Sequence, residues 1–66
     1  MQIYLNGAPR HFETGTTLDS LLEVEGLAER RVAVELNGEI VPRSRHATQA
    51  LGDGDRVEIV HALGGG

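Results

Sequence analysis

The sequence predicts a single α+β domain in which one helix packs on one face of a β-sheet, because three patterns agree. Short segments with apolar residues at alternate positions, typical of strands, occur on both sides of one helical segment. An Asn-Gly pair, favoured in tight hairpin turns, follows two of these segments at Asn6-Gly7 and Asn37-Gly38. Apolar side chains at helical spacing are clearest in residues 18–25. The predicted order is therefore β-β-α-β-β, with room for one minor extra strand or turn.

The N-terminal segment is expected to form a hairpin. Residues 2–5 alternate between polar and apolar side chains, and the first Asn-Gly pair follows them directly. The second strand is predicted to run through about residues 10–13, with Phe12 facing the core. Pro9 is placed where this strand begins, because the missing N–H of proline does least harm at that position.

Residues 18–25 are predicted to form the one main helix. Thr17 is a good N-cap, since its hydroxyl can accept a hydrogen bond from the first turn. Gly26 suits the left-handed position that ends many helices, and Leu27 can then fold back onto the helix. The spacing i, i+3 and i+4 gives one apolar stripe, made of Leu18, Leu21 and Leu22.

The second half of the sequence returns to strands. Residues 32–36 alternate as a strand, and residues 40–41 are expected to form a short return strand after the second Asn-Gly turn. Residues 43–50 are polar and are predicted to be an irregular connection, with Leu51 tucked into the core. A turn at 52–55 then leads into a last strand over residues 56–61, whose inward residues are Val57 and Ile59.

Composition excludes several classes of function. There is no cysteine, hence no disulfide and no thiolate metal site, and a net charge of −4 argues against nucleic acid as the main partner. No apolar segment is long enough to cross a membrane, so a cytoplasmic protein without a membrane partner is expected. The three histidines lack the spacing of a metal site. No set of acids, bases and nucleophiles stands together in the sequence, so an enzyme is not expected.

The last five residues are the remaining candidate for chemistry. Residues 1–61 are interpreted as the folded domain, and residues 62–66 as a flexible tail that ends in three glycines. Such a tail carries its α-carboxylate away from the folded body, to where the active site of another protein can reach it; a frayed end is the alternative. For acyl chemistry the carboxylate needs activation, most simply as an anhydride with a nucleotide. A sulfur nucleophile can then convert it into a thiocarboxylate.

Over essentially its whole length, the sequence resembles the small ThiS-type sulfur carrier proteins of thiamin biosynthesis. The most specific match is LNGEIVPR at residues 36–43, supported by Thr17 with the two leucines after it, by residues 51–59 and by the glycine terminus. The resemblance implies a ubiquitin-like β-grasp fold, with a mixed sheet whose first and last strands lie parallel at its centre. The small subunit of molybdopterin synthase is a cousin with the same chemistry, in chains that usually run longer.

The resemblance also implies a mechanism and partners. A ThiF-like enzyme adenylates Gly66, a persulfide sulfur donor supplies the sulfur for a thiocarboxylate, and a ThiG-like thiazole synthase takes that sulfur into the thiazole ring. ATP and magnesium belong to the activating enzyme, so this chain binds no cofactor of its own. Carried over by position, Gly66 bears the modification and Gly65 provides clearance. Gly64 adds slack at a position where relatives often carry alanine.

Strand alternation suggests where such partners dock. If the inward residues of the last strand face the core, Val60 faces solvent, and with Leu63 it gives an apolar patch beside the tail. The chain is expected to be a monomer on its own. Two further readings stay open: a protein modifier joined to other proteins through Gly66, and a plain interaction domain with an incidental tail.

Overall fold

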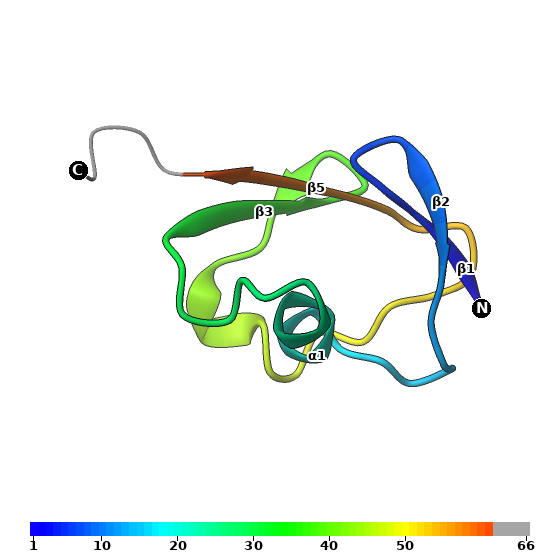
Figure 1. Cartoon of the computed structure of the whole chain (residues 1–66), viewed down its shortest axis with the longest axis horizontal. Helices are drawn as coiled ribbons and strands as arrows, with labels where there is room; N and C mark the ends of the chain where they lie inside the picture. Colours follow the sequence, from blue (N-terminus) through cyan, green and yellow to red (C-terminus); the bar gives the residue numbers. More distant parts are fainter. Residues whose placement is uncertain (62–66) are drawn as a thin grey trace.

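The computed structural model describes residues 1–61, in which a five-stranded sheet carries one α-helix on one face (Figure 1). The order is β-β-α-β-β-β, which includes the one minor extra strand that the prediction allowed, and a short 3-10 helix precedes the last strand. The elements are β1 (Gln2–Leu5), β2 (Ala8–His11), α1 (Leu18–Val24), β3 (Val32–Leu36), β4 (Glu39–Ile40), η1 (Arg43–Arg45) and β5 (Arg56–His61).

The sheet is mixed, with the strand order β2-β1-β5-β3-β4. β1 and β5 run parallel as neighbours, and every other pair is antiparallel. The first and last strands of the chain therefore meet inside the sheet, while β2 and β4 form its edges. This is the arrangement that the β-grasp resemblance implied.

Both Asn-Gly turns have the predicted form. Asn6 and Gly7 have φ values of 50° and 86°, and Asn37 and Gly38 have 53° and 87°. Two successive residues with positive φ make the tight turn whose twist matches that of the strands it joins. Because the first turn has only two residues, Ala8 already pairs with Leu5 across it.

The second strand consequently lies about two residues earlier than predicted, over Ala8–His11 instead of residues 10–13. Pro9 lies inside the strand, opposite Tyr4, which is allowed because β2 is an edge strand. Phe12 follows the strand and packs against the core, as expected of an inward residue.

Helix α1 begins and ends as the sequence indicates, within one residue. The Thr17 hydroxyl oxygen accepts a hydrogen bond from the backbone N–H three residues later, at 3.2 Å. At the other end Gly26 has a φ of 75°, and its N–H donates to the Glu23 carbonyl at 3.0 Å. The Leu27 N–H donates to the Leu22 carbonyl at 2.8 Å, which completes the double hydrogen bond typical of a glycine-terminated helix.

The return strand β4 is one residue earlier than predicted, because Val41 leaves the strand and turns into the core. The Val41 N–H donates to the Val34 carbonyl at 2.9 Å, so this turn keeps the backbone of Val41 paired. Pro42 then precedes η1, where the sequence predicted an irregular connection. The Arg45 N–H closes this turn on the Pro42 carbonyl at 2.9 Å.

A bidentate ion pair joins β2 to the end of α1. Arg10 Nη2 lies 2.6 Å from Glu25 Oε2, and Arg10 Nη1 lies 3.1 Å from Glu25 Oε1. The hydrogen bonds to Glu25, and then its charge, raise the pKa of Arg10 above its ordinary value. Arg10 also lies over the ring of Phe12, with 5.6 Å between the guanidinium carbon and the ring centre.

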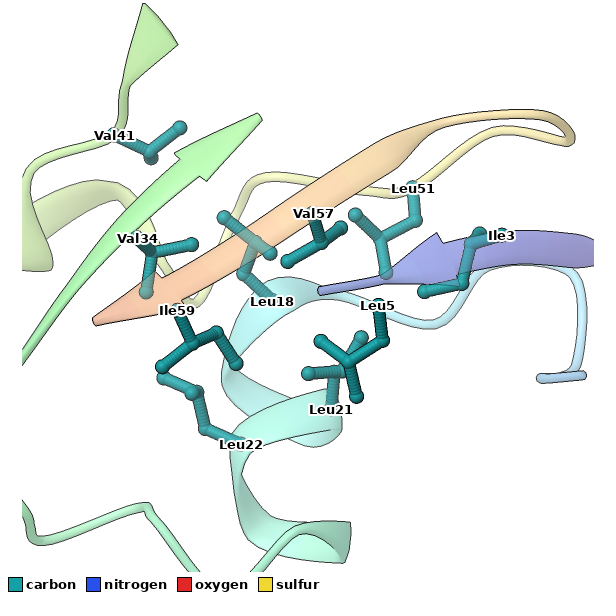
Figure 2. Packing of buried hydrophobic residues seen from close by; sticks show 10 residues of the cluster. All are labelled: Ile3, Leu5, Leu18, Leu21, Leu22, Val34, Val41, Leu51, Val57 and Ile59. Atoms are coloured by element: carbon teal, nitrogen blue, oxygen red, sulfur yellow. The ribbon is translucent and has the colours of Figure 1, made fainter. Parts of the chain in front are cut away.

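The core lies between the sheet and α1 (Figure 2). Every leucine of the predicted helical stripe is buried, as are Val57, Ile59 and Leu51. Within residues 1–61, no helix is both long and apolar enough to cross a membrane. The buried apolar residues are Ile3, Leu5, Leu18, Leu21, Leu22, Val34, Val41, Leu51, Val57 and Ile59.

Candidate functional site

The candidate site is the end of β5 that leads to residues 62–66. On one side β3 pairs with this strand from Val57 to His61. On the other side β1 pairs only with Arg56 and Val57, because the first hairpin turns away after Leu5. The last residues of β5 therefore have a strand partner on one side only (Figure 1).

Asn6 continues the contacts of the first hairpin with β5 beyond the end of β1. Its backbone N–H donates to the Val57 carbonyl at 2.8 Å, which is the last backbone hydrogen bond between this hairpin and β5. Its side-chain Oδ1 then accepts from the Ile59 N–H at 2.8 Å, and its Nδ2 donates to the Ile59 carbonyl at 3.4 Å. A primary amide has the donor and the acceptor of a peptide group, so Asn6 continues the pairing of β5 by one more residue.

Asn37 holds the beginning of β5 in the same way, from the other hairpin. Its N–H donates to the Arg56 carbonyl at 2.8 Å, and its Oδ1 accepts from the Arg56 N–H at 2.9 Å. Its Nδ2 also donates to Asp55 Oδ1 at 3.0 Å. The sequence pattern predicts that both asparagines form turns, but it does not predict this second role. The signal is that the first turn residue is Asn in both hairpins. Of Asn, Asp and Gly, which this tight turn prefers at that position, only Asn has a side-chain amide that both donates and accepts.

Replacing Asn6 with glycine is expected to loosen the end of β5 and leave the turn intact, because glycine adopts the positive φ of this position. The loss of two hydrogen bonds at Ile59 costs roughly 0.5–1.5 kcal/mol for each. In the Asn6→Gly variant, the amide of Ile59 should lose more protection from hydrogen exchange than the loss of global stability alone would cause. Asn37→Gly is the matched control and should lower protection at Arg56 instead. Equal protection of Ile59 in the two variants would contradict this role of Asn6.

The side chains of β5 alternate as predicted. Val57 and Ile59 face the core, while Val60 is 56% exposed on the opposite face. The orientation expected for Val60 is therefore confirmed, and its part in docking stays a prediction. The other predicted site residues lie outside the described residues: Leu63, Gly64, Gly65 and Gly66.

Three residues of types that can bind metal ions, a histidine and two aspartates, make hydrogen bonds within the fold. His46 is buried, with its Nε2 2.9 Å from the Val41 carbonyl oxygen. In the turn before β5, Asp53 accepts from the Gln2 N–H at 2.8 Å, and Asp55 accepts from the Gly52 N–H at 2.7 Å. Residues 1–61 bring together no group of three or more side chains that could hold a metal ion.

Comparison with known proteins agrees with this geometry. The model of the ThiS family matches residues 3–66. The sulfur carrier protein ThiS of Thermus thermophilus is 42% identical over 64 residues, which cover 97% of this chain and 98% of that protein. The crystal structure of the thiamine biosynthesis protein ThiS from Geobacter metallireducens has a TM-score of 0.87 and 33% identity, and covers all of both chains.

A thiazole synthase from Paramagnetospirillum magneticum is also similar, with 47% identity over all 66 residues of this chain. The chain spans only 20% of the length of that relative. The family match covers nearly the whole chain, and the described domain shares its fold with the solved relative. The chain belongs to the ThiS family.

Proposed function

We propose that this chain is a sulfur carrier protein of thiamin biosynthesis, and that its cargo is held as a thiocarboxylate on Gly66. The observation that carries the proposal is the family match, which runs through the glycine end to Gly66. The fold supports it, because the strand before residues 62–66 is the central strand of the sheet and is held by both hairpins. The chain then acts as a co-substrate of its partner enzymes.

The chemistry follows from the properties of a carboxylate. In this proposal Gly66 bears a free α-carboxylate, which is ionised at neutral pH and is a poor electrophile. A ThiF-like enzyme uses ATP and magnesium to join it to AMP, with release of pyrophosphate. The outer sulfur of a persulfide donor displaces AMP and forms an acyl disulfide. A thiol then cleaves its S–S bond, so that a thiocarboxylate stays on the chain and the thiol forms a disulfide with the remaining sulfur of the donor. Gly65 and Gly64 have no side chains, so a narrow channel can admit them.

A ThiG-like thiazole synthase is the proposed acceptor of the sulfur. A thiazole synthase from Paramagnetospirillum magneticum contains a region similar to the whole of this chain, which supports a functional link between the two proteins. The transfer of sulfur to and from this chain is proposed to take place in the cytoplasm. Val60, exposed next to the end of β5, and Leu63 are proposed to contact the activating enzyme.

ATP–pyrophosphate exchange with the ThiF-like enzyme tests this proposal. Wild-type chain should support exchange, because adenylation of Gly66 is reversible while AMP remains attached. Leu63→Asp should lower the exchange rate about tenfold, since it puts a charge into an apolar contact. Val24→Asp is the matched control, because Val24 is an apolar side chain of α1 that is 66% exposed. No exchange with wild-type chain would contradict the proposal, and an unchanged rate for Leu63→Asp would remove Leu63 from the contact.

A further inference from the structure

A cavity of about 170 Å³ lies between α1, the segment that leads from α1 to β3, and η1. α1 and η1 lie on the same side of the sheet (Figure 1), and the Asp19 N–H of α1 donates to the His46 carbonyl, just after η1, at 3.0 Å. No residue of β5 within the described part of the chain lines the cavity, so it is separate from the surface around Val60. Its apolar lining includes Leu22 and Val32, and its polar lining is Asp19, Arg30, Arg43 and His46.

One ring nitrogen of a buried histidine in the cavity wall has no protein partner. His46 is only 5% exposed, and its Nε2 lies 2.9 Å from the Val41 carbonyl oxygen. A carbonyl oxygen only accepts hydrogen bonds, so Nε2 carries the proton and Nδ1 of the neutral ring is an acceptor. Among residues 1–61 no hydrogen bond reaches Nδ1, and no fully buried side-chain nitrogen or oxygen lacks a partner, so Nδ1 must be accessible. The cavity that His46 lines is the opening through which a ligand reaches it.

Two arginines on different elements bring positive charge to the same cavity. Arg43 begins η1, and its Nη2 donates to the Ala28 carbonyl at 3.5 Å, which places its guanidinium beside the segment that leads to β3. Arg30 belongs to that segment. Neither arginine forms an ion pair among residues 1–61, where Arg10–Glu25 is the one ion pair. A guanidinium presents five N–H donors in a planar fork that matches the oxygens of a phosphate group, and most of these donors remain available here.

The charge and the size of the cavity both favour a small anion. Asp19 is the one acidic residue of its lining and forms no ion pair with either arginine. Two guanidiniums therefore face one carboxylate, and the lining keeps a positive charge although the whole chain has a net charge of −4. Pockets that enclose drug-sized ligands have volumes of roughly 300–1,000 Å³. The cavity is smaller than these, so it suits a single tetrahedral ion or one phosphate group of a larger molecule.

We propose that this cavity binds a phosphate-type oxyanion between Arg30, Arg43 and Nδ1 of His46. The two guanidiniums donate to separate oxygens of the anion, as charge-assisted hydrogen bonds. The imidazole donates to it from Nδ1 when the ring is protonated, while Nε2 keeps its bond to the Val41 carbonyl. Asp19 opposes the anion and limits its affinity. The site goes beyond the proposed sulfur transfer, since it takes no part in the chemistry at Gly66.

Titration of the whole chain with inorganic phosphate, followed by amide chemical shifts, tests the site. Saturable shifts are expected around Arg30, Arg43 and His46, with a dissociation constant on the order of 1 mM. Arg30→Gln and Arg43→Gln should each weaken binding about tenfold, because each removes a charged donor. Asp19→Asn should strengthen it about threefold, because it removes the opposing charge. Arg31→Gln is the matched control: it removes the same charge from an exposed residue outside the lining, and should change the affinity by about twofold or less.

Sulfate isolates the part of His46, because sulfate keeps its charge near neutral pH and any change in its affinity comes from the chain. It should bind about fivefold more tightly at about pH 6 than at about pH 8, since histidine gains its second proton in this range and only the charged ring donates from both nitrogens. The charged groups that share the cavity with this ring are Asp19 from α1, Arg30 before β3 and Arg43 from η1. An affinity for sulfate that is equal at both pH values would contradict the assignment of Nδ1 and with it the inference.

Pyrophosphate and AMP, titrated at the same ionic strength, distinguish the sources of the phosphate group. If one of them shifts the same residues at a lower concentration than phosphate, the site stands and that molecule is its ligand. Shifts that grow without saturation for all three, or a loss of affinity in Arg31→Gln equal to that in Arg30→Gln, would show only screening of surface charge and overturn the inference. None of these measurements involves Gly66, so their failure leaves the proposed function untouched.

Discussion

Deletion of Gly66 is expected to abolish thiazole formation while the folded domain stays intact. The deletion moves the terminal carboxylate back by one residue, about 3.3–3.6 Å in an extended chain. A displacement of about 1 Å at a reacting centre already lowers rates on the order of a hundredfold, so the loss should exceed this. Reconstituted thiazole formation with the ThiF-like enzyme, the ThiG-like synthase and a persulfide donor measures the effect.

The melting temperature of the Gly66 deletion should equal that of wild-type chain, because the ten buried apolar residues of the described core all precede residue 62. Gly64→Ala is the control within residues 62–66 and should keep most of the activity, because it leaves Gly65 and Gly66 in place. Thiazole formation that survives the deletion would show that the sulfur is not carried on Gly66.

Truncation of Leu21 to alanine is expected to have the largest effect on stability. Leu21 is 0% exposed and points from α1 into the core beneath the sheet (Figure 2). Leu→Ala at a buried site lowers the free energy of unfolding by about 2–5 kcal/mol. Because alanine favours a helix at least as well as leucine, this loss comes from the cavity and from the apolar surface that is no longer buried. A domain of this size has a total stability of only roughly 3–10 kcal/mol. A large part of the variant should therefore be unfolded at 37 °C.

Urea denaturation followed by circular dichroism measures this change in the free energy of unfolding. Val24→Ala is the control on the same helix, and because Val24 is 66% exposed its stability should change by about 0.5 kcal/mol or less. If Leu21→Ala is as stable as the Val24 variant, the core is not formed as described.

The strands and turns with strong local signals were predictable from the sequence. Residues 32–36 and 56–61 form β3 and β5 with the predicted bounds, and both Asn-Gly pairs form the expected turns. The predicted second strand begins two residues too late, because the local pattern favours Pro9 at the beginning of a strand and not inside it. Only its place at the edge of the sheet, which local pattern does not show, allows proline inside β2.

Features that depend on strand register were not predictable from periodicity. The amide of Asn6 meets Ile59 because β1 ends beside the middle of β5, and Glu35 meets Glu58 through the pairing of β3 with β5. Residues far apart in the sequence create both contacts. For the site itself, the sequence predicted the outward orientation of Val60, which the structure confirms. The roles of Gly64, Gly65 and Gly66 stay predictions that experiments must test.

The intact mass of the chain, produced together with its native activating enzyme and sulfur donor, tests most directly whether Gly66 carries sulfur. We expect a mass increase equal to the replacement of one oxygen by sulfur, which fragmentation places on Gly66. The increase should be absent without ATP and should disappear when a ThiG-like synthase and its substrates consume the sulfur. An unmodified mass under these conditions, or chain joined through Gly66 to other proteins, would contradict the sulfur carrier account.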